Sequence, residues 1–235
     1  MNAINRTARV AGGLYFFSIA VGILAAVIGR SRLILYGDAA ATARNIMASG
    51  WQFRIGFVGD LIATVLFFLT AWALYVLLRP VDKNLASLFM LLNLGGVAVQ
   101  CINDLSLLAA LLLLSGADYL RVFPADQLQA LAMLFLSLHK NGFWIGQIFF
   151  AAWLFPLGYL VFKSAFLPKI LGIILIVDGV GWLITVWQYF LFPRYEVITY
   201  LTYPLGFIAE FGLTLWLLIK GVNIEQWKKR ALESA

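Results

Sequence analysis

The segment FRIGFVGDLIATVLFFLTAWALYVLL, residues 53–78, is the feature that most restricts the fold of this chain. It is long and apolar enough to cross a bilayer, because a transmembrane helix needs about 20 mostly apolar residues. A helix is expected, since an open strand would leave backbone groups unpaired in hydrocarbon. The segment nevertheless contains Arg54 and Asp60, and both charges need an explanation.

The composition of the whole chain indicates a membrane protein. Of its 235 residues, 63% are hydrophobic and only 12% are charged, whereas a soluble domain carries about 25% charged residues. The basic residues lie between apolar runs rather than on one face, and no nucleic-acid-binding motif is recognisable. We therefore expect membrane lipid as a partner and no nucleic acid. Cys101 is the single cysteine, so an intrachain disulfide is excluded.

Six apolar segments predict an all-α fold, a six-transmembrane-helix bundle that forms a single domain over residues 1–235. A short surface helix is expected in the first outer loop, with Asp38 as its N-cap and Gly50 as its stop signal. The helical stretch after Pro124 either lies at the outer interface or lengthens the fourth span. The spans are expected near residues 9–29, 54–78, 85–114, 142–162, 168–191 and 198–219.

The distribution of Lys and Arg predicts the orientation of the spans, because cytoplasmic loops of membrane proteins are enriched in both. With six spans the two termini share one side of the membrane. Cytoplasmic termini place ten of the 17 basic residues inside, and four of the other seven belong to or border the long first loop. We therefore predict cytoplasmic N and C termini.

Polar residues inside the spans are concentrated in the predicted outer half and near the midplane. At about 1.5 Å per helical residue, Asp60 lies about 9 Å below the outer end of its span. By the same measure, Glu210 and Asp178 lie about 15 and 13 Å from the cytoplasmic ends of theirs. A polar intramembrane cup, open to the outer side, would explain this distribution. The other candidate binding residues of this cup are Asp38, Arg54, Asn103, Asp104, Lys140 and Gln147.

Asp60, His139 and Glu210 are the candidate catalytic residues, because an acid inside a membrane costs about 2.5–3.5 kcal/mol on insertion scales and points to function by default. They would act as acid–base groups or as metal ligands. Carboxylate and imidazole suit Zn²⁺ or Mn²⁺, but no paired-histidine or paired-cysteine motif identifies a metal or another cofactor. The opposite interpretation is structural, with each acid forming only a hydrogen bond between helices.

Asp60 needs a partner from another part of the chain. Arg54 lies six residues away, whereas pairing along one helix requires a spacing of three or four residues. The expected partners of Asp60 are therefore His139, Lys140, Asn103 or a protonated carboxyl group.

An ordered set of motifs resembles a known family. The motifs are YGDAAATARNI, FRIGFVGDL, LYVLLRPVDKNLA, LHKNGF, FFAAWLFPLGYLVFKSAFLPKILG and AEFGLTLWLLIKG. In this order they resemble the bacterial membrane proteins of domain-of-unknown-function family 4386, from about residue 9 to residue 221. The resemblance implies a six-span protein of the bacterial inner membrane and no particular activity. The family pattern includes Asp38, Arg54, Asp60, His139 and Glu210.

Three classes of function are compatible with these residues. The first is a membrane protein that binds or processes a lipid or small molecule at the outer leaflet. The second is a carrier or channel that uses the buried acids as proton or cation sites. The third is a structural or regulatory subunit. The sequence selects neither an enzyme nor a substrate, and it leaves the oligomeric state open.

Overall fold

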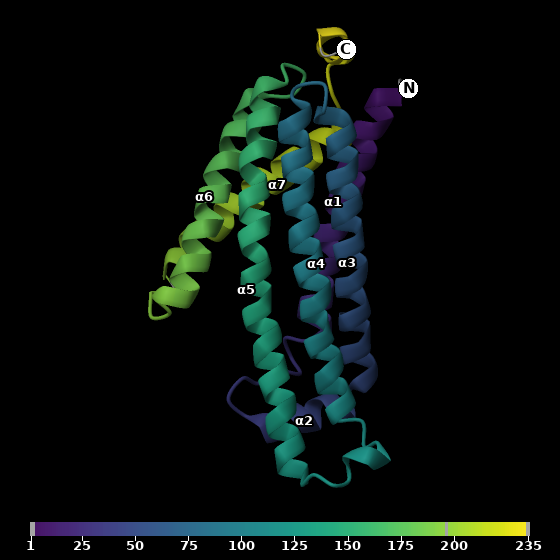
Figure 1. The fold of residues 1–235 in the computed structure, drawn as a ribbon, viewed down its shortest axis with the longest axis vertical. Coiled ribbons are helices and arrows are strands. Elements are labelled where there is room, and N and C mark those ends of the chain that lie inside the picture. The colour runs from purple at the N-terminus through teal and green to yellow at the C-terminus, as the bar shows by residue number, and fades with distance from the viewer. Residues whose placement is uncertain (1–2, 196, 234–235) are drawn as a thin grey trace. The chain divides into compact units, whose positions relative to one another are not determined.

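The computed structural model describes residues 3–195 and 197–233, and within them it contains helices and no strand (Figure 1). A short 3-10 helix, η1, covers Asp118–Leu120. The α-helices of the described residues are α1 (Ala3–Gly29), α2 (Ala39–Ala48), α3 (Gly50–Leu78), α4 (Lys83–Leu113), α5 (Ala125–Lys163), α6 (Lys169–Leu191), α7 (Val197–Ile219) and α8 (Ile224–Glu233).

Six helices of the described residues, α1 and α3 to α7, are long and apolar enough to cross a membrane. This confirms the all-α fold and the six predicted spans, and the chain is a multi-pass membrane protein. The largest difference from the predicted bounds is in α5, which is 39 residues long. The stretch after Pro124 continues into the fourth span without a break, so it lengthens that span.

The short helix of the first loop is confirmed as α2. Asp38 has an extended backbone conformation, and its carboxylate accepts a hydrogen bond from the backbone N–H of Ala41 at 2.8 Å. This is the geometry of an N-cap. α2 ends at Ala48 with Ser49 as its C-cap, so Gly50 lies at the next position, where a stop glycine is expected, and it also begins α3.

The chain divides into two compact units. The first unit comprises Met1–Phe17, Leu66–Val97 and Trp144–Ala235, and the second comprises Ser18–Val65 and Ala98–Phe143. Four helices, α1, α3, α4 and α5, contribute one segment to each unit. That residues 1–235 act as a single domain stays a prediction.

Aromatic side chains fill the core of the first unit. The indole of Trp153 on α5 is 1% exposed, and its centroid lies 6.2 Å from the ring of Tyr15, 5.0 Å from that of Phe67 and 6.2 Å from that of Phe89. These three partners come from α1, α3 and α4. Edge-to-face contacts of this kind add about 0.5–1.5 kcal/mol per pair to the burial of the rings.

In the second unit, glycines bring α1 and α3 into backbone contact. A Cβ atom on Gly29 would lie 2.3 Å from the Cα atom of Gly56, and one on Gly59 would lie 2.8 Å from the Cβ of Ala25. Small residues at such positions allow membrane helices to approach closely. The sequence places Arg30 directly after Gly29 and Asp60 directly after Gly59, so the same contact brings two charges together.

We expect Gly29→Ala to destabilise the protein, because the added methyl group collides with the backbone of α3 rather than with a movable side chain. Overpacking of this kind typically costs about 1–3 kcal/mol. The measurement is the apparent midpoint of thermal unfolding in detergent, followed by tryptophan fluorescence. Gly50→Ala is the matched control, because nothing lies within 4 Å of its added Cβ. Equal midpoints for the two variants would contradict the close contact.

Candidate functional site

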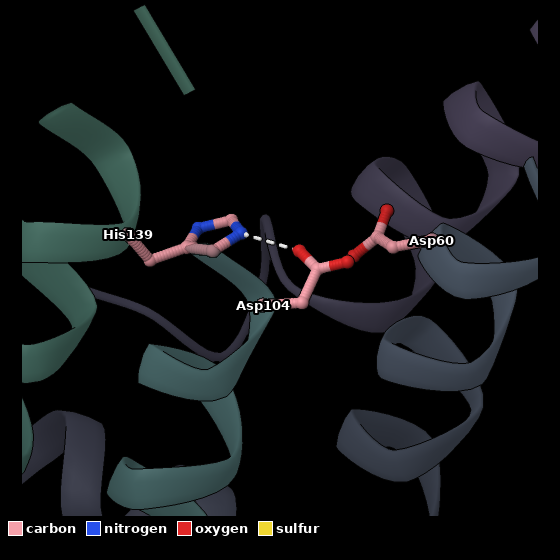
Figure 2. Close-up of side chains that lie close together, drawn as sticks. All are labelled: Asp60, Asp104 and His139. Atoms are coloured by element: carbon pink, nitrogen blue, oxygen red, sulfur yellow. Dashed lines mark hydrogen bonds and ion pairs between the residues drawn. The ribbon is translucent and has the colours of Figure 1, made fainter. Parts of the chain in front are cut away.

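Three helices of the second unit bring two carboxylates and an imidazole together (Figure 2). Asp60 lies on α3, Asp104 on α4 and His139 on α5. One potential metal-ligand atom from each of the three lies within 4.8 Å of the other two. We call these three residues the Asp–Asp–His cluster.

Asp104 is the central residue of the Asp–Asp–His cluster. It is 1% exposed, and its Oδ1 atom lies 3.4 Å from Nε2 of His139 and 3.3 Å from the side-chain nitrogen of Gln100. Its Oδ2 atom has no hydrogen-bond partner in the described structure, and this side of the carboxylate faces Asp60 in Figure 2. A buried carboxylate oxygen without a partner is costly, and this one is directed toward a second carboxylate.

Asp60 forms an ion pair with Arg30, and the two side chains are 12% and 16% exposed. This corrects the expectation that its partner would be His139, Lys140, Asn103 or a protonated carboxyl group. Arg30 lies just beyond the end of α1, in the segment predicted as the long first loop. The signal that could have identified it is a glycine directly before each charge, at positions where α1 and α3 touch.

The backbone around His139 is fixed by a contact between α4 and α5. The side-chain amide of Asn103 donates a hydrogen bond to the carbonyl oxygen of His139 at 2.9 Å. A Cβ atom on Gly142 would lie only 2.0 Å from Oδ1 of Asn103, so the amide fits here only because residue 142 has no side chain. Asn103 is thus a positioning residue, while the His139 ring itself is 93% buried, with 7% exposure.

The two carboxylates of the Asp–Asp–His cluster face a single guanidinium group. As formal charges, Asp60 and Asp104 contribute two negative charges and Arg30 contributes one positive charge, which leaves an excess of one negative charge before His139 is counted. In surroundings of low dielectric constant, an unbalanced charge is strongly unfavourable. The arrangement therefore favours one additional cation close to the two carboxylates.

Three other predicted binding residues of the second unit lie outside this cluster. Asp38 caps α2, and Arg54 is exposed. Lys140 is also exposed, and its ammonium group lies 4.9 Å from the centre of the Tyr36 ring. Cys101, which is one turn before Asp104 on α4, is an exposed free thiol.

The structure places Glu210 in the first unit, whereas Asp60 and His139 belong to the second. Glu210 accepts a hydrogen bond from the hydroxyl group of Tyr15. Asp178 on α6 and a half-buried Gln147 on α5 belong to the same unit. The predicted outward-facing cup would join residues of both units, and it stays a prediction.

Sequence comparison identifies the family of the chain. The model of the family described as Domain of unknown function (DUF4386) matches residues 10–221. The chain belongs to domain-of-unknown-function family 4386. An uncharacterized protein of Archaeoglobus fulgidus is 30% identical to it over 169 residues, which are 72% of this chain and 85% of that protein. No solved structure matches the chain. Because that relative is archaeal, membership of the family does not by itself indicate a bacterial source.

We expect Arg30→Met to destabilise the protein strongly, because it leaves the Asp60 carboxylate buried without its partner. Breaking a buried ion pair on one side costs about 3–5 kcal/mol. Thermal unfolding in detergent measures the effect.

The double variant Arg30→Met with Asp60→Asn removes both charges and should recover part of this loss. Arg54→Met is the control, since Arg54 is exposed and surface substitutions usually change stability by less than about 0.5 kcal/mol. A loss in Arg54→Met as large as that in Arg30→Met would argue against the ion pair.

Proposed function

We propose that this membrane protein binds one divalent transition-metal ion, Zn²⁺ or Mn²⁺, at Asp60, Asp104 and His139. The observation that carries the proposal is the Oδ2 atom of Asp104, which is buried and unpartnered next to two further metal-ligand groups. The excess of one negative charge around these residues supports the same conclusion. If these acids had only a structural role, each carboxylate oxygen would have a hydrogen-bond or ion-pair partner. The Oδ2 atom of Asp104 has no such partner in the described structure.

The composition of the ligand set supports a metal that acts on a substrate. Carboxylate and imidazole ligands suit Zn²⁺ and Mn²⁺, and zinc sites with three protein ligands keep a fourth position for water or substrate. Zinc–ligand distances are about 2.0–2.2 Å, so three ligand atoms up to 4.8 Å apart would move inward onto the ion. Such an ion polarises a carbonyl or phosphoryl oxygen.

Arg30 supports an anionic substrate for this site. With a divalent ion bound, the two carboxylates, the neutral imidazole and the guanidinium leave a net charge of about one positive unit. A phosphate or carboxylate group on a lipid or on a small molecule would balance that charge. We therefore propose that the protein binds or processes an anionic lipid or small molecule at this site.

The orientation of the protein belongs to the same proposal. The distribution of basic residues favours cytoplasmic termini, and this orientation opens the Asp–Asp–His cluster toward the outer leaflet. A plasma membrane, as in the inner membrane of bacteria, is the expected location. Membrane lipid is then both the solvent of the protein and a source of the proposed ligand.

Metal content tests the proposal directly. The full-length protein is purified in detergent, dialysed, and analysed by inductively coupled plasma mass spectrometry beside His139→Ala and Asp104→Asn. We expect about one Zn or Mn per chain in the wild type and at least a tenfold loss in both variants, because each variant removes one of the three ligands. Lys140→Ala is the matched control, since this neighbouring side chain is exposed and should leave the metal content unchanged.

Wild-type protein that contains no metal after incubation with Zn²⁺ and with Mn²⁺ would overturn the proposal. Equal metal content in the wild type and in both ligand variants would do the same. Size-exclusion profiles of the variants establish that a loss of metal is not a loss of fold.

We expect Gly142→Ala to weaken metal binding without removing a ligand, because the methyl group displaces Asn103 and releases the backbone of His139. Loss of such an orienting contact typically lowers metal affinity about 10–100-fold. Competition with a chelating fluorophore measures the Kd for Zn²⁺. Gly50→Ala, which adds the same methyl group in open space, should bind as the wild type does; equal weakening in both would contradict the role of Asn103.

A further inference from the structure

A second pair of acids lies in the first unit, between α6 and α7. Gly206 is one helical turn before Glu210, and a Cβ atom on it would lie 3.0 Å from Oδ1 of Asp178 and 3.2 Å from Nε1 of Trp182. Asp178 and Trp182 are likewise one turn apart on α6. The absence of a side chain at residue 206 therefore leaves room for the carboxyl group of Asp178 against α7, one helical turn from Glu210.

Hydrogen-bond donors are distributed unequally between the two acids. Glu210 accepts a hydrogen bond from the hydroxyl of Tyr15, and a donor in this position suits a carboxylate anion. Asp178 is 1% exposed, and neither of its carboxyl oxygens has a hydrogen-bond partner in the described structure. An ionised carboxylate in that position would be desolvated and uncompensated, so Asp178 is the group that holds a proton.

The surroundings of this pair supply no balancing cation. In the described part of the chain, the structure shows no ion pair between either acid and Lys, Arg or His. The titratable side chain from α1 is Tyr15, and Tyr203 of α7 lies beyond the indole of Trp182, with ring centres 5.7 Å apart. From α3 and α5 the neighbours of Tyr15 are the apolar rings of Phe67 and Trp153.

We propose that Asp178 and Glu210 form a proton-binding site, in which the two carboxyl groups share one exchangeable proton between α6 and α7. A proton is the ligand that suits this site, because the surroundings of Glu210 are already occupied. The hydroxyl of Tyr15 contacts Glu210, and buried rings enclose that hydroxyl. The residues of this site belong to the first unit, and none of them belongs to the Asp–Asp–His cluster.

Binding and release of the proposed proton would change the packing of α6 against α7. When the proton leaves for bulk water, two carboxylates remain opposite one another in surroundings of low dielectric constant, where like charges repel strongly. This repulsion favours separation of α6 from α7 around Gly206. Return of the proton removes one charge and restores the close contact, so the pair is suited to a proton-driven conformational change.

Infrared difference spectroscopy of the full-length protein in detergent tests the site, because a protonated carboxyl group has a C=O stretching band that a carboxylate lacks. At neutral pH we expect such a band in the wild type, and we expect Asp178→Asn to remove it. The band should shift after exchange into D₂O, disappear at alkaline pH and return when the pH is lowered. Asp118→Asn is the control, because the side chain of Asp118 is 86% exposed.

Two results would overturn the proposal. One is a band that Asp178→Asn leaves at full intensity, and the other is a wild-type band that neither pH nor D₂O changes. A band that appears only when Na⁺ is replaced by choline would instead identify a metal-cation site, and it would equally exclude an exchangeable proton as the resident ligand.

A measurement on the wild type alone covers the case in which Asp178→Asn does not fold. Dicyclohexylcarbodiimide adds to protonated carboxyl groups in apolar surroundings and forms a stable N-acylurea. We expect mass spectrometry of proteolytic fragments to find this adduct on Asp178 or Glu210 at neutral pH, with less at alkaline pH and none on Asp118. Labelling that does not change with pH would contradict a proton that leaves the site.

Discussion

Backbone contact between α1 and α3 is the interaction on which the polar centre of the second unit depends. Gly29 and Gly56 allow the two helices to touch. Arg30, directly after Gly29, then reaches Asp60, which is one turn after Gly56 on α3. A carboxylate at the position of Asp60 would otherwise have to be neutralised or exposed to water. With Asp60 held as an anion by Arg30, Asp104 faces a second negative charge. The two carboxylates then exceed the single charge of Arg30, and this excess would attract the proposed cation.

The two units stabilise their buried acids by different means. In the second unit, cationic and potentially cationic side chains surround the carboxylates, and Arg30 and His139 each contact one acid. In the first unit, the neutral hydroxyl of Tyr15 contacts Glu210, and within the described residues Asp178 has no hydrogen-bond donor. Charge balance therefore favours the proposed metal ion in the second unit and the proposed proton in the first. Both sites nevertheless contain a pair of aspartate or glutamate side chains in an apolar helix bundle.

The sequence predicted the local features well, because they depend on short segments. Span length and apolarity determine which helices cross a membrane, and Asp38 caps α2 through a bond to a residue three positions away. Residue types also drew attention to Asp60 and His139, which the structure places in the Asp–Asp–His cluster. Arg30 was missed because its role depends on how closely two helices pack. The role of Tyr15 was likewise missed, because it depends on the tertiary contact that places its hydroxyl group against Glu210.

The position of Cys101 has a practical consequence for work on this protein. It is the single thiol of the chain, it is exposed, and it precedes Asp104 by three residues on α4. Side chains three residues apart lie on neighbouring positions of a helix surface. A spin label or fluorophore attached to the natural sequence would therefore sit at one known place beside the Asp–Asp–His cluster, and its accessibility to water-soluble or lipid-soluble quenchers would reveal how deep in the bilayer that cluster lies.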